Sequence, residues 1–540
     1  MKDISSTGSF INFYLNNYIY VDKTQYIRDL IKLERVFISR PRRFGKSLTL
    51  DTIATLFETG VEPYFKGTWI YDKWTEPTYP VLRLNFLDLD KYSLEHFKQK
   101  LNAIISSFAR DINVKNYEEK VEPEDTIYFL LDELRKEKRQ IVILIDEYDC
   151  QMTANINNET LYKQFHEKIK SFYANIKNKW PIKFLGITGV TRLKDVEIFS
   201  IGSDIRDITN ASAYSQMIGF TRDEIKKYYI DYLKLASSYE NNCNVDEVND
   251  DNLESLLDRL AKNYDGYCFD EFYKKKVFST WSVNKFFQSV VSNKFVYFGE
   301  YWYDNGGLPS ILVNYLKTHE LNIFEYLDKD KFLKVSSDDF KNPTALTTIN
   351  QNVLMCQTGY LTLRSDLNKT STVALGIPNG EIYKALNRLL ANNIFKGNTD
   401  ITDDYGRSLL EVGTVDDIIN LFNSALNSVS YDNYPIVSES SVQNMLKLYL
   451  LGAHQKVLSE VHEAKGRADL VVNTDNRRIV FEFKYAKNET EAKSKLLDAV
   501  EQIKTRDYGN IVPNKTELLR IAAVFNADPK VRAFTEYQEV

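Results

Sequence analysis

The chain has 540 residues and a formal net charge of −6 at pH 7, and 43% of its residues are hydrophobic. This length exceeds what one hydrophobic core usually organises, so we expect two or three domains rather than one. The acidic balance excludes a global attraction to nucleic acid, so any such partner would require a locally basic surface.

Cysteine usage and hydropathy indicate the setting of the chain. The four cysteines lie far apart without a CxxC pair, which argues against a zinc site or a disulfide framework and favours a reducing, intracellular setting. No apolar run approaches the roughly 20 residues needed to span a bilayer. We therefore expect a cytoplasmic protein with no membrane partner.

Short apolar runs separated by helical periodicity occupy the first part of the chain. The runs lie at residues 35–41, 80–86, 141–149 and 182–190. Each is short enough to be a buried parallel strand, and apolar residues between them, such as Phe165 and Ile169, recur at helical spacing. Alternating strands and helices predict an α/β domain with a parallel sheet over residues 1–221.

The sequence ISRPRRFGKSLTL follows the first run and opens a helix. In that position backbone N–H groups and a helix N-terminus surround a phosphate. The predicted phosphate-binding loop comprises Arg43, Phe44, Gly45, Lys46 and Ser47. Lys46 would reach the β- and γ-phosphates of ATP, and Ser47 would ligate Mg²⁺. Arg40 stands where the usual pattern has a glycine, so the loop is atypical.

Two acidic residues, Asp146 and Glu147, end the third apolar run. Asp146 would hold the magnesium shell, and Glu147 would polarise the water that attacks the γ-phosphate. Arg192 follows the fourth run, where such ATPases place a polar residue that senses the γ-phosphate. It could contact phosphate within the same chain, or it could pair with Asp195 at the surface.

Each part of this site has an alternative structural explanation. Lys46 could be a solvated lysine at a helix start, and Asp146 and Glu147 could cap a strand and begin a turn. Their order in the chain, with a strand between them, favours nucleotide binding over these alternatives.

The rest of the chain divides into three further segments. Residues 222–345 are helical and aromatic-rich, which suits a helical lid or linker domain. Residues 346–435 begin with a possible helix, two β-prone runs and a new helix after Pro378, which suits a winged-helix-like connector. From residue 436, a helix, three strand-like runs, a helix at 489–507 and a last strand at 518–525 predict a separate mixed α/β domain over 436–540.

The last domain contains a carboxylate pair within GRADLVVNTDNRRIVFEFKYAK. Strand alternation places Glu482 and Lys484 on one face, and Asp469 on the neighbouring strand can approach Glu482. Two such carboxylates bind Mg²⁺ through hard oxygen ligands. Lys484 could then orient or deprotonate water for phosphodiester hydrolysis.

Two alternatives stay open at this site. A helix acid usually completes such an arrangement, and either Glu439 ahead of the first strand or Glu463 on that strand could serve. An edge hairpin with solvated charges would show the same residues without any metal.

Nine short motifs lie along the chain: YVDKT (20–24), RPRRFGKS (40–47), LIDEYD (144–149), TGVTR (188–192), IGFTRDEI (218–225), YDGYCF (264–269), EYWYDNGG (300–307), QTGYLTL (357–363) and IPNGE (377–381). Together they resemble the AAA-ATPase-like proteins that carry a C-terminal PD-(D/E)XK nuclease-like domain, over most of the chain. The resemblance implies a P-loop NTPase sheet followed by a restriction-endonuclease-like domain. It also implies that Arg40 belongs to the family's own loop, that Asp22 and Lys23 form a recurring motif, and that Gln502 belongs to the nuclease site.

Three functional hypotheses follow. The first is an ATP-binding and ATP-hydrolysing switch coupled to a Mg²⁺-dependent nuclease that acts on nucleic acid, on DNA in preference to RNA. The second is a nucleotide-gated DNA- or protein-binding signalling module whose nuclease-like domain is inactive. The third is an ATPase that remodels partners other than nucleic acid. In each case the chain could assemble into a homo-oligomer when ATP binds.

Overall fold

The computed structural model describes residues 1–193, 204–302, 310–316, 319, 323–343, 345–395, 404–453, 455–463, 466–508 and 517–540. These residues form two compact units. The first comprises Met1–His319 and Phe332–Ile382, and the second comprises Glu320–Lys331 and Tyr383–Val540. The expected boundaries at residues 221, 345 and 435 divide the chain more finely, and they stay predictions.

The first unit is built on a five-stranded parallel sheet in the order β2-β3-β4-β1-β5. Its strands are β1 (Arg35–Ser39), β2 (Val81–Asn85), β3 (Ile141–Asp146), β4 (Ile182–Gly189) and β5 (Arg206–Asp207). The four longer strands coincide with the four apolar runs, because strands covered on both faces need apolar residues at nearly every position. The predicted α/β fold is confirmed.

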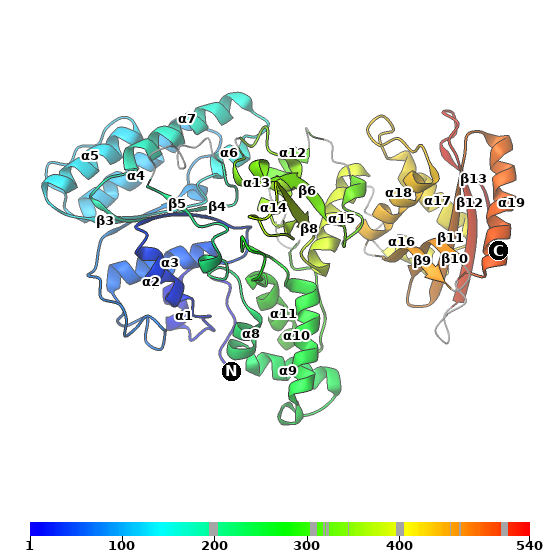
Figure 1. Ribbon diagram of the computed structural model, residues 1–540, viewed down its shortest axis with the longest axis horizontal. Helices are drawn as coiled ribbons and strands as arrows, with labels where there is room; N and C mark the ends of the chain where they lie inside the picture. The colour runs from blue at the N-terminus through cyan, green and yellow to red at the C-terminus, as the bar shows by residue number, and fades with distance from the viewer. Residues whose placement is uncertain are drawn as a thin grey trace. The chain divides into compact units, whose positions relative to one another are not determined.

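Helices cover both faces of this sheet (Figure 1). One face carries α4 (Leu94–Asp111), α5 (Pro123–Lys136) and α7 (Glu159–Ile176), and the other carries α1 (Phe10–Leu15), α2 (Thr24–Ile31) and α3 (Lys46–Thr59). The short α6 (Cys150–Ala154) follows β3. Since β1, β3 and β4 run parallel, their carboxyl ends meet at one edge of the sheet, which is where open α/β sheets bind ligands.

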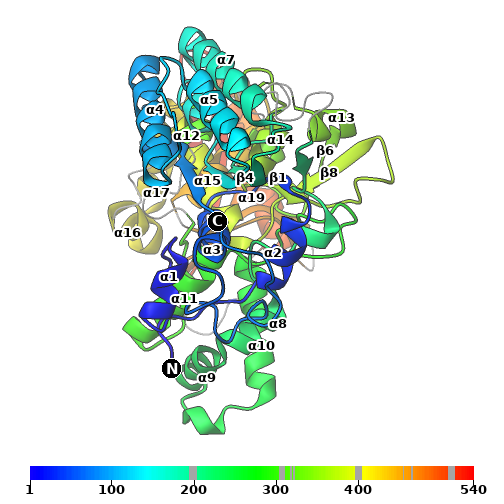
Figure 2. The same cartoon turned by 90° about the vertical axis from the view of Figure 1, so that its left-hand side faces the viewer.

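A helical module lies on the same side of the sheet as α1 to α3 (Figures 1 and 2). It contains α8 (Arg222–Tyr228), α9 (Ile230–Asn241), α10 (Asp250–Tyr264) and α11 (Thr280–Asn293). Buried residues such as Leu233, Leu257 and Phe287 form its core. The chain's first residues join this module, because Asn284 donates to the Ser5 carbonyl at 3.1 Å and Gln288 to the Ile4 carbonyl at 3.1 Å.

A small antiparallel sheet in the order β6-β8-β7 completes the first unit. Its strands are β6 (Leu333–Ser336), β7 (Thr362–Leu363) and β8 (Thr372–Gly376), accompanied by α12 (Ser310–Leu316), α13 (Ser337–Lys341) and α14 (Gln351–Gln357). Helix α15 (Gly380–Ile394) begins in this unit. The helix, strands and helix expected after residue 346 are present, and the winged-helix-like assignment stays a prediction.

The second unit contains a mixed five-stranded sheet in the order β13-β12-β11-β10-β9, in which only the β11–β12 pair is parallel among the described residues. Its strands are β9 (Lys456–Glu463), β10 (Gly466–Asn473), β11 (Arg477–Ala486), β12 (Glu517–Asn526) and β13 (Ala533–Glu539). Strand β13 was not predicted, because Phe534 is its only buried residue and the run lacks an apolar signal.

Helices flank this second sheet on both faces. They are α16 (Asp404–Val412), α17 (Val415–Asn427), α18 (Glu439–Gly452) and α19 (Glu489–Arg506). Val480 packs against Ala499 and Ile503 of α19, whereas its neighbour Phe481 packs against Phe422 of α17 at 5.3 Å between ring centroids. None of the helices described in either unit is long and apolar enough to cross a membrane.

Candidate nucleotide and nuclease sites

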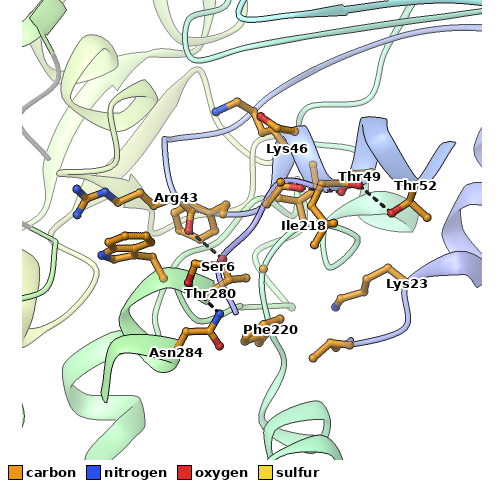
Figure 3. A pocket seen from close by; sticks show the side chains of 18 of the residues that line it. Ser6, Lys23, Arg43, Lys46, Thr49, Thr52, Ile218, Phe220, Thr280 and Asn284 are labelled. Carbon is orange, nitrogen blue, oxygen red and sulfur yellow. Dashed lines mark hydrogen bonds between the residues drawn. The ribbon is translucent and has the colours of Figure 1, made fainter. Parts of the chain in front are cut away.

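The loop between β1 and α3 borders a cavity of about 320 Å³ in the first unit (Figure 3). Gly45 ends this loop with φ 103° and ψ 23°, a left-handed conformation that glycine adopts without the penalty of a side chain. The cavity is lined by the loop, by Ser5–Gly8 of the N-terminal segment, by Glu147 and by residues of the helical module. A helix N-terminus therefore opens into a cavity, as phosphate binding requires.

Lys46 is buried at the mouth of the loop, with 4% of its surface exposed. Its Nζ donates to the carbonyls of Arg40 at 3.0 Å and Pro41 at 3.2 Å and lies 3.6 Å from Oε1 of Glu147. A lysine held in this way is not the solvated side chain of the alternative explanation. The Glu147 carboxylate and two neutral carbonyls share its charge, so an anion in the cavity would compete with Glu147 for the ammonium group.

Ser47 and Asp146 come together at the end of β3. The Ser47 hydroxyl donates to Oδ2 of Asp146 at 2.6 Å, and the Thr188 hydroxyl of β4 donates to Oδ1 at 2.6 Å. The carboxylate is thus fixed from two sides. A hydroxyl and a carboxylate are the hard oxygen donors that Mg²⁺ prefers, so these residues fit the ion expected here.

Glu147 follows Asp146 in a left-handed conformation, with φ 50°, and lines the cavity. Burial raises the pKa of Glu147, the nearby Asp149 and Asp146 raise it further, and Lys46 lowers it. Asp149 has a different role, because it accepts from the backbone and hydroxyl of Thr191 at 2.7 and 2.6 Å. Of these acids, Glu147 is the one placed to accept a proton inside the cavity.

The Arg43 and Phe44 side chains turn towards the helical module. Arg43 Nη1 donates to the carbonyls of Tyr301 at 2.8 Å and Trp302 at 2.9 Å, and Figure 3 shows the side chain pointing away from Lys46. Phe44, 1% exposed, packs edge-on against Tyr267 at 4.7 Å between ring centroids. Both residues line the cavity, and these side-chain contacts anchor the loop.

Two other arginines of the sequence analysis lie outside the cavity lining. Arg192 forms an ion pair with Asp207 on β5, while Asp195 lies outside the described residues. Arg40 is buried and donates to the Thr209 carbonyl at 2.5 Å, with its guanidinium 4.2 Å above the Phe269 ring. Arg40 therefore ties β1 to the segment after β5, in a place where a glycine would leave a void.

Lys23 lines the cavity opposite the loop, and Asp22 does not. Lys23 pairs with Glu224 of α8 at 2.6 Å and donates to the Gln216 carbonyl at 2.8 Å. Asp22 lies just before α2 and accepts from the Thr24 backbone at 2.9 Å. Sequence reasoning missed Glu224, although its place in the IGFTRDEI motif was a usable signal.

The predicted carboxylates and lysine of the second unit also come together. Lys484 Nζ lies 2.7 Å from Oε1 of Glu482 and 3.5 Å from Oε1 of Glu439, which stands at the start of α18. Asp469 on β10 accepts from the Phe483 backbone at 2.8 Å. Glu482 is fully buried, so this is not a hairpin with solvated charges.

Electrostatics mark the two acids as a coupled pair. Burial raises the pKa of Asp469 to about 6 and that of Glu482 to about 7, and the Asp469 charge adds to the shift at Glu482. Lys484 lowers both pKa values, but both stay above those of an ordinary aspartate and glutamate. Two carboxylates that share one lysine in a desolvated site are typical of a site that a divalent cation completes.

The Asp469 and Glu482 carboxylates fit Mg²⁺ if water or substrate oxygens complete its coordination. Oε2 of Glu482 is buried without a hydrogen-bond partner and is therefore open to a further ligand. Among the described residues, no cluster of three or more Asp, Glu, His or Cys side chains forms a metal site. A metal would therefore be held by Asp469 and Glu482 and would take its remaining oxygens from water or substrate.

Glu439 and Glu463 were the two candidates for the further acid that completes the site. Glu439 lies beside Lys484, whereas the Glu463 side chain lies outside the described residues. Gln443, one turn after Glu439, hydrogen-bonds to Asp469 and was missed by sequence reasoning. Gln502 donates to the Tyr508 hydroxyl at 3.3 Å, on the α19 side of the sheet.

Comparison with known proteins finds a matching family model within each unit. Residues 5–199 match a family model described as Predicted AAA-ATPase, and residues 437–535 match that of the PD-(D/E)XK nuclease superfamily. An uncharacterized protein in the vnfD 5′ region of Azotobacter chroococcum mcd 1 is 26% identical over 533 residues, covering 95% of this chain and 94% of that protein. The crystal structure of Cdc6p from Pyrobaculum aerophilum aligns with a TM-score of 0.27 and 11% identity, covering 72% of this chain and 98% of that one. The family resemblance of the motifs is confirmed.

Proposed function

We propose that this chain, which carries an AAA-ATPase-like domain and a C-terminal PD-(D/E)XK nuclease superfamily domain, hydrolyses ATP and uses it to control cleavage of nucleic acid, with DNA as the expected substrate. The observation that carries the proposal is the convergence of Lys46, Ser47 and Glu147 at one helix N-terminus, with Asp146 bound to Ser47.

The cavity has the polarity that a nucleoside triphosphate needs. The loop and Lys46 offer backbone N–H groups and positive charge to the phosphates. The far part of the lining includes apolar side chains such as Phe13, Ile19 and Phe220, which suit a base and ribose. Mg²⁺ held by Ser47 and Asp146 would supply neutralising charge to the phosphates.

Hydrolysis of ATP requires a base near the γ-phosphate. Glu147 lies beside Lys46 and has a raised pKa, so it can take a proton from water as the water attacks phosphorus. Lys46 stabilises the charge that moves onto the phosphate oxygens. The fixed position of Asp146 keeps the Ser47 end of the site organised during this step.

Phosphodiester cleavage is assigned to the second unit. Lys484 lies 2.7 Å from Glu482 and could orient the attacking water, while Asp469 and Glu482 would hold the metal. The metal would supply stabilisation of the charge on the scissile phosphate. Burial lowers the pKa of Lys484, but Glu482 and the other acids around it raise it by more, so Lys484 donates rather than accepts at neutral pH.

The test is a cleavage assay on the full chain. Labelled single- and double-stranded DNA and RNA are incubated with Mg²⁺, with and without ATP, for the wild type, Glu482→Ala and Lys46→Ala. We expect cleavage that is lost in Glu482→Ala and that responds to ATP only when Lys46 is intact.

Two other outcomes would redirect the assignment. DNA binding without cleavage in the wild type would favour a binding or signalling module with an inactive nuclease-like domain. ATP hydrolysis that depends on Lys46 but is indifferent to DNA and RNA would leave only the ATPase.

A further inference from the structure

The phosphate-binding loop is anchored by Arg43 to a single turn of the helical module. Arg43 donates to the carbonyls of Tyr301 and Trp302, and its guanidinium stacks 4.6 Å above the Trp281 ring. The Arg43 backbone has φ 69°, a conformation that costs free energy for any residue with a side chain. The contacts made by Arg43 therefore hold the loop in a shape that it would not adopt alone.

One peptide group connects Arg43 to the buried acid Glu381. The peptide between Tyr301 and Trp302 accepts through its carbonyl from Arg43 and from Trp281 Nε1 at 3.1 Å. Its N–H donates to Oε1 of Glu381 at 2.8 Å. Hydrogen bonds at both ends of a peptide polarise it, so each strengthens the other, and the guanidinium and the carboxyl interact through one shared dipole.

Glu381 closes a ring of contacts around the loop. It is 2% exposed at the first turn of α15, and its Oε2 accepts from the Ser282 hydroxyl at 2.7 Å. Ser282 belongs to α11, and Thr280 of the same helix donates to the Arg43 carbonyl at 2.9 Å. Glu381 thus binds the peptide that holds the Arg43 side chain, and it binds the helix whose Thr280 holds the Arg43 backbone.

A carboxyl group buried this deeply is retained only when its hydrogen bonds are made. Burial raises the pKa of Glu381 to about 8, and the donors from Ser282, Trp302 and Tyr301 lower it. In either protonation state Oε1 can accept from the Trp302 N–H. The acceptor oxygen, more than the net charge, is therefore what the loop requires from this residue.

We propose that Glu381 is a positioning residue for the nucleotide site, acting on the phosphate-binding loop through the Tyr301–Trp302 peptide and Arg43. The proposal rests on the nucleotide binding proposed above. Glu381 touches neither the cavity nor the reacting atoms, so it is not a catalytic residue. Its effect reaches the phosphates only by fixing the backbone N–H groups of the loop.

The experiment is a double-mutant cycle on the full chain. The dissociation constant for the methylanthraniloyl derivative of ATP with Mg²⁺ is measured for the wild type, Glu381→Leu, Arg43→Ala and the double variant, with circular dichroism and thermal unfolding to confirm folding. Glu381→Gln keeps an acceptor oxygen and serves as the conservative variant. Glu133→Gln changes an equally buried glutamate of α5, outside the cavity, and is the matched control.

We expect Glu381→Leu and Arg43→Ala each to weaken binding roughly tenfold, because each variant removes a hydrogen bond that holds the loop. The double variant should bind no more weakly than Arg43→Ala alone. Glu381→Gln should recover most of the affinity, and Glu133→Gln should bind as the wild type does. Should Glu381→Leu fail to fold, Glu381→Met, which also removes both acceptor oxygens, takes its place in the cycle.

Three results would overturn the proposal. Additive effects in the cycle would show that Glu381 does not act through Arg43. Wild-type affinity in both Glu381 variants would show that the loop does not need it. A wild-type chain that binds no better than Lys46→Ala would overturn the nucleotide site itself and this inference with it.

Discussion

The Ser47 hydroxyl donates a 2.6 Å hydrogen bond to Asp146, a residue 99 positions further along the chain. The bond joins the first turn of α3 to the end of β3, where Thr188 holds the other carboxylate oxygen. Neither residue needs to move far to exchange this bond for a shared metal ion, so the site is organised before its ligand arrives.

Replacing Ser47 by Ala should therefore separate magnesium binding from nucleotide binding. We expect affinity for ATP with Mg²⁺ to fall about 10- to 100-fold, while affinity for ATP in EDTA changes little, because only the metal loses a ligand. Calorimetric titration measures both. Thr55→Ala alters a buried threonine of the same helix that bonds to the Asp51 carbonyl, and it should change neither affinity. Equal losses with and without Mg²⁺ would contradict the assignment.

Glu147→Gln should uncouple ATP binding from ATP hydrolysis. The variant keeps the shape of the side chain but cannot accept a proton, so we expect the hydrolysis rate to fall about 10²- to 10⁴-fold with a nearly unchanged dissociation constant. Because burial raises the pKa of Glu147, the wild-type rate should rise with pH through a range above that of an ordinary glutamate. Phosphate-release assays over pH 5 to 8 test both points, and a variant that hydrolyses ATP normally would exclude Glu147 as the base.

Arg192→Ala tests whether Arg192 contacts phosphate, as the sequence suggested, or only pairs with Asp207, as in the structure. Arg192 pairs with Asp207 and is absent from the cavity lining, so we expect ATP affinity to stay within about twofold of the wild type, while the unfolding free energy falls by about 1 kcal/mol or less. A tenfold loss of affinity or hydrolysis at unchanged stability would instead favour a phosphate contact. Nucleotide titration and urea unfolding provide the two measurements.

Local geometry explains which site residues the sequence could predict. Glu482 and Lys484 share a face because strand side chains alternate, and Lys46 and Ser47 begin a helix because Gly45 ends the loop. These relationships depend on neighbours in the chain. A short apolar strand followed by an acid likewise predicted Asp146 without any knowledge of the sheet order.

Contacts between distant segments escaped prediction. Lys23 meets Glu224 across 201 residues, and Arg43 meets Trp302 across 259, and no periodicity in the sequence encodes either pairing. The predicted phosphate-binding loop included Arg43 because it stands next to Phe44 and Gly45 in the sequence. The aromatic turn at residues 301–302 provides carbonyls that bind it instead, and that turn is positioned by contacts with distant segments, among them the hydrogen bond from the Trp302 N–H to Glu381.

The carboxylate pair of the second unit predicts a pH dependence whose sign depends on the metal. The pKa values of about 6 for Asp469 and about 7 for Glu482 lie above those of unfolded chains, so without metal the folded state binds more protons between about pH 4 and pH 7. Stability from these groups is then fully present below about pH 4 and is lost as pH rises through 6 and 7. Mg²⁺ binds the ionised pair, so its stabilising effect should grow over that same range.

Thermal unfolding from pH 5 to 8, with EDTA or with Mg²⁺, measures this linkage directly. We expect Glu482→Gln to flatten the pH dependence in EDTA and to abolish the stabilisation by Mg²⁺, because the neutral amide removes both the titrating group and a metal ligand. Glu489→Gln changes an exposed glutamate of α19 that pairs with Lys493 and should leave both effects intact. A Mg²⁺ effect that persists in Glu482→Gln would place the metal elsewhere, because Asp469 alone cannot hold it against the burial that already favours its protonated form.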